Sequence, residues 1–194
     1  MTATRIRIPY DPATWIPVPL DYLGTDWADA GEWASWVAAE ASRGRPGEAE
    51  LAAAIEEHAR SIALFPAEHV GARFWHYPAD GVPTGFADAY VEARADDGID
   101  PAELLPELGF TVVEPVIEPA HADAFDRAVR RLTLSAVLPD EDAEPTLLPK
   151  AEWLGIRDGW VGYLVSVDHD ANALSSRLAD LDELFRTLDP ERIS

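Results

Sequence analysis

A chain of 194 residues that contains no cysteine has no disulfide framework and no cysteine-based zinc site. Its 36 acidic and 15 basic residues give a formal charge of −21, which would repel phosphate backbones and anionic lipids, so we expect no nucleic-acid binding and no membrane insertion. Hydrophobic residues make up 47% of the chain, enough for one buried core, and predict a single domain over 1–194. The opening residues lack the apolar run of a signal peptide, which favours a cytoplasmic protein.

The first segments predict one short strand followed by two helices. The alternating residues 5–9 predict an edge strand, and the proline-spaced residues 15–24 predict an extended connector. A helix is expected over 27–42, with Thr25 or Asp26 as its cap. A second helix follows and ends before Pro66, with apolar residues at helical spacing. These apolar residues are Leu51, Ile55, Ile62 and Phe65.

The periodicity changes to that of strands after Pro66. Segments 72–78 and 86–95 are separated by a turn-rich spacer, which predicts a hairpin. Alternation places two residues of the first strand, Phe74 and His76, on one face. The opposite face carries Arg73, Trp75 and Tyr77. The second segment is rich in alanine, so a helix over 86–95 stays open as an alternative.

Four more strands are expected, over 111–119, 125–139, 151–157 and 160–168. A short helix over 120–131 stays open as an alternative, and an acidic loop is predicted over 140–149. Asp158 and Gly159 suit a two-residue turn, and the strand after them is apolar on both faces, as in the centre of a sheet. A closing helix carries one apolar stripe, made of Leu174, Leu178, Leu181, Phe185 and Leu188.

The order of these elements predicts the fold class. Helices come first, a run of strands follows, and one helix closes the chain. Such segregation is typical of α+β proteins. We therefore expect a mainly antiparallel sheet with N-terminal helices and a C-terminal helix packed on its faces.

The closing segment, GYLVSVDHDANALSSRLADLDELFRTLDP, is a strand, a short polar turn and a helix that finishes in a phenylalanine and TLD. It resembles the C-terminal end of small actinobacterial proteins of the Mog1/PsbP-like superfamily. The resemblance implies an antiparallel sheet between helices. It also implies a non-enzymatic role, since members act as accessory proteins in photosystem assembly, small-GTPase regulation or envelope and secretion systems. They share no catalytic motif, so no active-site residue carries over.

Few residues are arranged for catalysis or metal binding. Asp168, Asp170 and Asn172 alternate like the start of a calcium loop, but Ala173 and Ala179 stand where that loop needs glycine and glutamate. We therefore expect Asp168 or Asp170 to cap the final helix. The five histidines show no pair with metal-ligand spacing, and the GxSxG, P-loop and dinucleotide motifs are absent. The prediction is no catalytic, cofactor-binding or metal residue.

Aromatic side chains provide the candidate partner-binding surface. Tryptophan is enriched at interfaces because its large rigid ring is desolvated at small entropic cost. Core packing is the first interpretation of the seven tryptophans, and a protein-binding face is the second. The candidate surface consists of Trp33, Trp36, Arg73, Trp75 and Tyr77.

These observations favour a non-catalytic cytoplasmic binding or accessory protein, adaptor-like or chaperone-like, that serves a secretion or envelope system. It would have a protein partner and no cofactor. One alternative is a small hydrolase or isomerase that uses His69 or His76 with a nearby carboxylate. Another is a structural subunit of a larger assembly. The sequence leaves the partner and the oligomeric state open.

Overall fold

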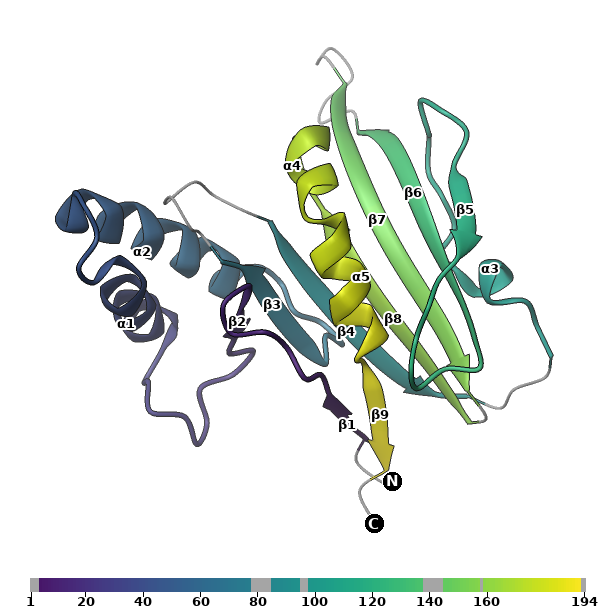
Figure 1. The fold of residues 1–194 in the computed structure, drawn as a ribbon, viewed down its shortest axis with the longest axis horizontal. Coiled ribbons are helices and arrows are strands. Elements are labelled where there is room, and N and C mark those ends of the chain that lie inside the picture. The colour runs from purple at the N-terminus through teal and green to yellow at the C-terminus, as the bar shows by residue number, and fades with distance from the viewer. Residues whose placement is uncertain (1–3, 78–84, 95–97, 138–144, 158, 193–194) are drawn as a thin grey trace.

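The computed structural model describes residues 4–77, 85–94, 98–137, 145–157 and 159–192. Its main feature is a seven-stranded sheet in which every neighbouring pair of strands is antiparallel (Figure 1). Helices accompany this sheet, so the prediction of an α+β fold with a mainly antiparallel sheet is confirmed. Within the described ranges, no helix is both long enough and apolar enough to cross a bilayer.

The strands of the main sheet follow the order β2-β3-β4-β8-β7-β6-β5. Their bounds in that order are Trp15–Val18, Ala72–His76, Phe86–Ala93, Trp160–Val167, Thr146–Arg157, Arg127–Val137 and Val116–Pro119. The predicted hairpin partners 72–78 and 86–95 are neighbours as β3 and β4, and the helical alternative for 86–95 is wrong. The helical alternative for 120–131 is also wrong, because 120–126 form a loop and β6 begins at Arg127.

Three segment predictions need correction. Residues 15–24 are not only a connector, because their first four form the edge strand β2. Pro17 is tolerated there because an edge strand leaves one side of its backbone unpaired. Residues 146–149 belong to β7 rather than to an acidic loop, and 138–144 lie outside the described residues. Of 111–119, only Val116–Pro119 forms a strand of the sheet.

The hairpin of β7 and β8 occupies the centre of the sheet. Arg157 pairs with Trp160, and Gly159 has a φ of +81°, a left-handed value that favours glycine. Asp158 lies outside the described residues. Strand β8 lies between β4 and β7, so the prediction of a central strand is confirmed.

One end of the sheet is covered by a helical hairpin made of α1 (Ala30–Ser42) and α2 (Glu48–Leu64). The cap of α1 is Asp29, whose carboxylate accepts the Glu32 N–H at 3.0 Å, so the prediction of Thr25 or Asp26 is wrong. Glu32 in turn accepts the N–H of Ala28, the residue before the cap, at 2.6 Å, an arrangement close to a capping box. The helix therefore starts three residues later than predicted and leaves Trp27 in the preceding loop.

The apolar faces of α1 and α2 pack on the side of the sheet that carries Trp75, which is fully buried. The opposite side carries Phe74 and packs against α4 (Ala171–Ser176) and α5 (Leu178–Arg186), which lie across the sheet in Figure 1. The predicted alternation of the β3 side chains is thus confirmed, and both faces of this strand meet helices. A short helix, α3 (Pro101–Leu104), contacts β6 and β7.

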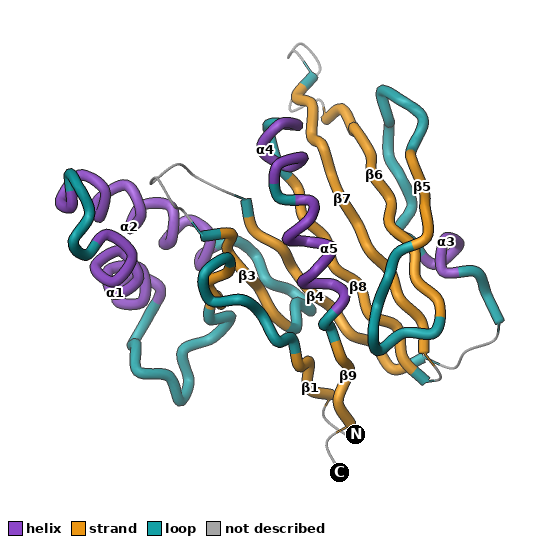
Figure 2. The backbone as a smooth tube through the Cα atoms, viewed as in Figure 1, coloured by secondary structure: helices purple, strands orange, loops and turns teal. Residues whose placement is uncertain are grey.

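The closing helix was predicted as one element, but the structure divides it. Arg177, only 1% exposed, ends α4 and precedes α5, and its guanidinium donates to Asp168 at 2.5 Å. Asp170 caps α4 through the Asn172 N–H at 2.8 Å, as expected for this segment. The chain then forms a strand that the sequence did not predict, β9 (Asp189–Arg192), which pairs with β1 (Thr4–Arg7) in a separate two-stranded sheet (Figure 2).

Two glycines hollow the sheet surface beneath a phenylalanine ring. Gly155 and Gly162 pair across β7 and β8. A Cβ added to either residue would lie 2.5 or 2.2 Å from the ring of Phe125. That ring also stacks on Phe185 of α5, with centroids 5.9 Å apart. The absence of side chains at these two positions therefore lets the core close over the middle of the sheet.

Candidate functional site

The structure separates the five residues of the candidate partner surface. Arg73 and Trp75 are 1% and 0% exposed, so they belong to the core and cannot contact a partner. Trp33 is 1% exposed, whereas Trp36 is 49% exposed. Tyr77 is half-buried. The predicted surface is therefore wrong for Arg73 and Trp75. Trp33 is buried as well, but unlike those two it lines a pocket, together with Trp36 and Tyr77.

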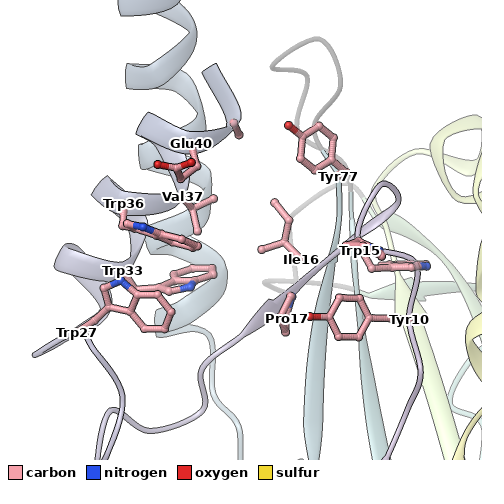
Figure 3. A pocket seen from close by; sticks show the side chains of 12 residues that line it. Tyr10, Trp15, Ile16, Pro17, Trp27, Trp33, Trp36, Val37, Glu40 and Tyr77 are labelled. Atoms are coloured by element: carbon pink, nitrogen blue, oxygen red, sulfur yellow. The ribbon is translucent and has the colours of Figure 1, made fainter. Parts of the chain in front are cut away.

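This pocket, which we call the tryptophan pocket, has a volume of about 300 Å³ and lies between α1 and the edge strand β2 (Figure 3). Six aromatic side chains contribute to its walls together with smaller apolar residues and one carboxylate. The aromatic residues are Tyr10, Trp15, Trp27, Trp33, Trp36 and Tyr77. The remaining residues are Pro12, Ile16, Pro17, Val37, Glu40 and Ala41.

One wall of the tryptophan pocket is a single face of α1. Its residues recur at intervals of three and four, which places them on one side of a helix. They are Trp33, Trp36, Val37, Glu40 and Ala41. The ring of Trp27, in the loop before the helix, lies 5.0 Å from the ring of Trp36 at an angle of 50°. Figure 3 shows these three indoles grouped on the helical side of the pocket.

The other wall is built from β2 and the segments next to it. Ile16 and Pro17 come from the strand, and Tyr10 precedes it. The Tyr10 ring packs on Phe74 at 5.3 Å, which fixes it against the sheet. Tyr77 follows β3 and donates its backbone N–H to the Thr14 carbonyl at 2.7 Å. The sheet therefore holds this wall, which includes Trp15 of β2, in place, while α1 and the loop before it supply the other three tryptophans.

Charge in the tryptophan pocket comes from one residue. Glu40 is the only acidic residue among those that line it, and no lysine, arginine or histidine is among them. The carboxylate of Glu40 forms an ion pair with Arg43, three residues later on the same helix. Both side chains are well exposed, at 43% and 67%. Such exposed pairs contribute roughly 0–1 kcal/mol to stability, so Glu40 is easily released to another cation.

Arg73, predicted to lie at the surface, anchors the helical hairpin to the sheet instead. Its guanidinium forms a two-pronged ion pair with Asp88 of β4, at 2.6 and 2.8 Å. It also donates to the carbonyls of three residues where α2 ends, at 2.8–3.0 Å. These residues are Ile62, Phe65 and Pro66. One buried side chain thus satisfies the end of α2 and holds α2, and α1 with it, against the sheet.

The histidines of the enzyme alternative lie in different surroundings. His69 is exposed, with Glu68 3.6 Å away. His76 is half-buried, and its Nε2 lies 2.9 Å from a carboxylate oxygen of Asp180 in α5. A small cavity of about 130 Å³ adjoins Asp180, but His76 is not among the residues that line it. The edge of Trp15 packs on the His76 ring at 5.0 Å. The contact between His76 and Asp180 links β3 to α5.

Three arginines of β6 have separate partners. Arg127 donates to the Ile99 carbonyl at 2.7 Å. Arg130 binds the carboxylates of Glu118 and Asp182. Arg131 forms a buried ion pair with Glu152 at 2.8 Å. Arg130 and Arg131 are thus paired with the protein's own carboxylates.

Glu152 is the most deeply buried carboxylate of the described chain, with 0% exposure. Besides Arg131, the hydroxyl of Tyr163 donates to it at 2.6 Å and the Lys150 ammonium lies 3.0 Å away. Burial alone would raise the pKa of this carboxyl, but the hydrogen bonds from its three partners outweigh burial and hold the pKa below its ordinary value. Glu152 is therefore fully paired, and this cluster stabilises the sheet.

This pairing predicts a specific sensitivity to acid. A carboxyl with a lowered pKa in the folded state contributes stability at neutral pH, and that stability is lost as pH falls below about 4, the ordinary carboxyl range. The unfolded chain binds the proton more readily, so acid favours unfolding. The wild type should therefore lose more free energy of unfolding than Glu152→Gln when the pH is lowered from about 6 to about 3. Urea titrations across this range measure the difference, and equal losses in both proteins would contradict the prediction.

No metal site forms among the described residues, because no three histidine or acidic side chains lie close enough together to hold an ion. Asp168 accepts the backbone N–H groups of His169 and Asp170 and the Arg177 guanidinium. Burial would raise the pKa of Asp168, but these hydrogen bonds outweigh it and lower the pKa. The oxygens that resemble the start of a calcium loop are thus engaged in closing a turn and capping α4.

No family model matches this chain, and no curated protein matches it. The resemblance to the Mog1/PsbP-like superfamily therefore stays a prediction.

Several residues of the tryptophan pocket were missed from the sequence. Glu40 follows the predicted Trp36 by four residues, so helical spacing alone could have added it to the site. Tyr10 and Ile16 could not, because they reach the pocket only once β2 has paired with β3. That pairing joins segments nearly sixty residues apart, and no local pattern indicates it.

Proposed function

We propose that this protein is a non-catalytic binding or accessory protein and that the tryptophan pocket is its binding site. The observation that carries the proposal is the group of six aromatic rings around one pocket, with the ring of Trp36 49% exposed beside the buried Trp33. Clustered tryptophans that stay open to solvent are typical of surfaces that bind a ligand or partner.

The dimensions of the pocket support this proposal. Small-molecule sites span roughly 300–1,000 Å³ and are mostly apolar, with a few polar groups that orient the ligand. The tryptophan pocket, at about 300 Å³, lies at the lower end of that range and carries one carboxylate. Its occupant is therefore a small molecule or a single projecting group of a partner. A pocket held between a helix face and a strand edge is also largely preformed, which reduces the entropy lost on binding.

The cellular setting belongs to the same proposal. The accessory role that we propose is in a secretion or envelope system, as the resemblance to Mog1/PsbP-like proteins implies, and a cytoplasmic location is part of the proposal. The enzyme alternative has one contact in its favour, between His76 and Asp180. It has less support than binding, since the cavity beside Asp180 is small and His76 does not line it.

A thermal-shift screen of small molecules and short peptides tests the binding proposal. Ligands that raise the melting temperature of the wild type should lose most of this effect on Trp36→Ala, because the exposed indole forms part of the pocket wall. Phe110→Ala is the matched control, because Phe110 is 74% exposed and does not line the pocket. Equal shifts for all three proteins would contradict the proposal.

A further inference from the structure

The residues that line the tryptophan pocket favour the binding of a positively charged ligand. The faces of aromatic rings carry negative potential, and a cation within about 6 Å of a ring centroid is attracted to it, most strongly by tryptophan. Four of the six rings in the walls are indoles. The only charged residue among the pocket residues is Glu40, so an incoming cation competes only with the exposed Arg43, which lies outside the pocket, for this carboxylate.

Glu40 is placed to act together with the indoles. It follows Trp36 by four residues and Trp33 by seven, so the three side chains lie on the same face of α1. Figure 3 shows the Glu40 carboxylate next to the Trp36 ring on the helical wall. Its described partner, Arg43, is exposed and does not line the pocket. A ligand cation over the indole would therefore be within reach of a carboxylate that is held only by an exposed ion pair.

The scarcity of hydrogen-bond acceptors indicates the type of cation. Apart from Glu40, the side-chain hydrogen-bond acceptors of the pocket are the hydroxyls of Tyr10 and Tyr77, since the indole N–H groups only donate. A primary ammonium carries three N–H donors, each of which must exchange water for a protein acceptor. A trimethylammonium group carries none, and its methyl groups can contact the aromatic faces directly.

We propose that the tryptophan pocket binds a small organic cation with a trimethylammonium head group, with the indole of Trp36 and the carboxylate of Glu40 as its main recognition elements. The inference rests on the proposed function and names its ligand class. The volume of about 300 Å³ suits a small molecule. The formal charge of −21 favours the approach of such a ligand.

Choline and its neutral isostere 3,3-dimethylbutan-1-ol provide a direct test, because the two have nearly the same shape and differ in charge. Calorimetric titration of the full chain should show choline binding at least about tenfold more tightly than the isostere. Glu40→Gln should weaken choline binding about fivefold, in the range expected for one partly exposed carboxylate. Glu57→Gln is the control, since it removes the same charge from α2 at a residue outside the pocket.

Each outcome decides between the two proposals. Tighter binding of choline than of the isostere, reduced by Glu40→Gln and unchanged by Glu57→Gln, supports the cation site. Equal binding of both compounds overturns it and leaves an apolar binding site. No binding of choline, together with Trp36-dependent ligands in the thermal-shift screen, overturns the cation site alone. No binding of choline and no Trp36-dependent ligand overturns the proposed function as well.

Discussion

Arg73→Ala is expected to lower the free energy of unfolding by about 3–5 kcal/mol, the range found when one partner of a buried ion pair is removed. The substitution leaves the Asp88 carboxylate buried without its cation. It also leaves three carbonyls at the end of α2 without their donor. Urea denaturation followed by circular dichroism measures the loss.

The substitution Arg73→Lys tests whether a positive charge without the shape of a guanidinium is sufficient for stability. Arg73→Lys keeps the positive charge but cannot reach Asp88 and the carbonyls of α2 at once, since only the planar guanidinium presents donors in several directions. We expect Arg73→Lys to recover only part of the lost stability. If the free energy of unfolding of Arg73→Ala lies within about 1 kcal/mol of the wild-type value, Arg73 does not anchor the helical hairpin.

The second large effect is expected where Phe125 lies over the two glycines. Phe125→Ala should cost about 3–5 kcal/mol, because it removes a buried ring and leaves a cavity. Gly162→Ala should lower the free energy of unfolding by about 1–3 kcal/mol. Here the cause is overpacking rather than a cavity, since the added Cβ would overlap the same ring. Urea denaturation of both variants measures these losses.

Combining the two substitutions tests this contact directly. In Phe125→Ala the ring no longer occupies the space above Gly162, so adding Gly162→Ala should cost less than it does in the wild type. The double variant should therefore be more stable than the sum of the two single losses by about 1 kcal/mol or more. Gly109→Ala is the control, because nothing lies within 4 Å of the Cβ it would add. Strict additivity would show that the ring and the glycine do not interact.

Local patterns predicted the elements of this fold better than their ends. The alternation in β3 placed Phe74 and Trp75 on opposite faces correctly, because a strand has a strict two-residue period. The start of α1 was misplaced because three residues near it are able to cap a helix. Asp29 becomes the cap because only it has a glutamate, Glu32, three residues later, whose carboxylate accepts the N–H of Ala28 just before the cap.

Long-range pairing accounts for most of what the sequence did not predict. Strand β9 is only four residues long and exists because the chain returns beside β1. The break at Arg177 likewise depends on Asp168, which lies outside the helices. A continuous apolar stripe predicts one helix, and only the buried ion pair indicates why it divides into two.

In the candidate site, too, local spacing predicted some residues correctly, and long-range contacts decided the others. The spacing of Trp33 and Trp36 predicted a shared helix face, and both line the tryptophan pocket. Arg73 was placed in the candidate surface because it alternates onto one strand face with Trp75 and Tyr77. Its burial depends on Asp88 and on the end of α2, which are fifteen and about ten residues away in sequence. A charged residue in a strand is therefore ambiguous until its partners are known.

The central claim, that the tryptophan pocket is the binding site, is tested most directly by the indole N–H signals in a proton–nitrogen correlation spectrum. With a ligand from the thermal-shift screen, the signals of the four pocket tryptophans should shift, and those of the other three should stay in place. The four are Trp15, Trp27, Trp33 and Trp36, and the other three are Trp75, Trp153 and Trp160. Shifts confined to the second group, with the pocket indoles unchanged, would contradict the claim.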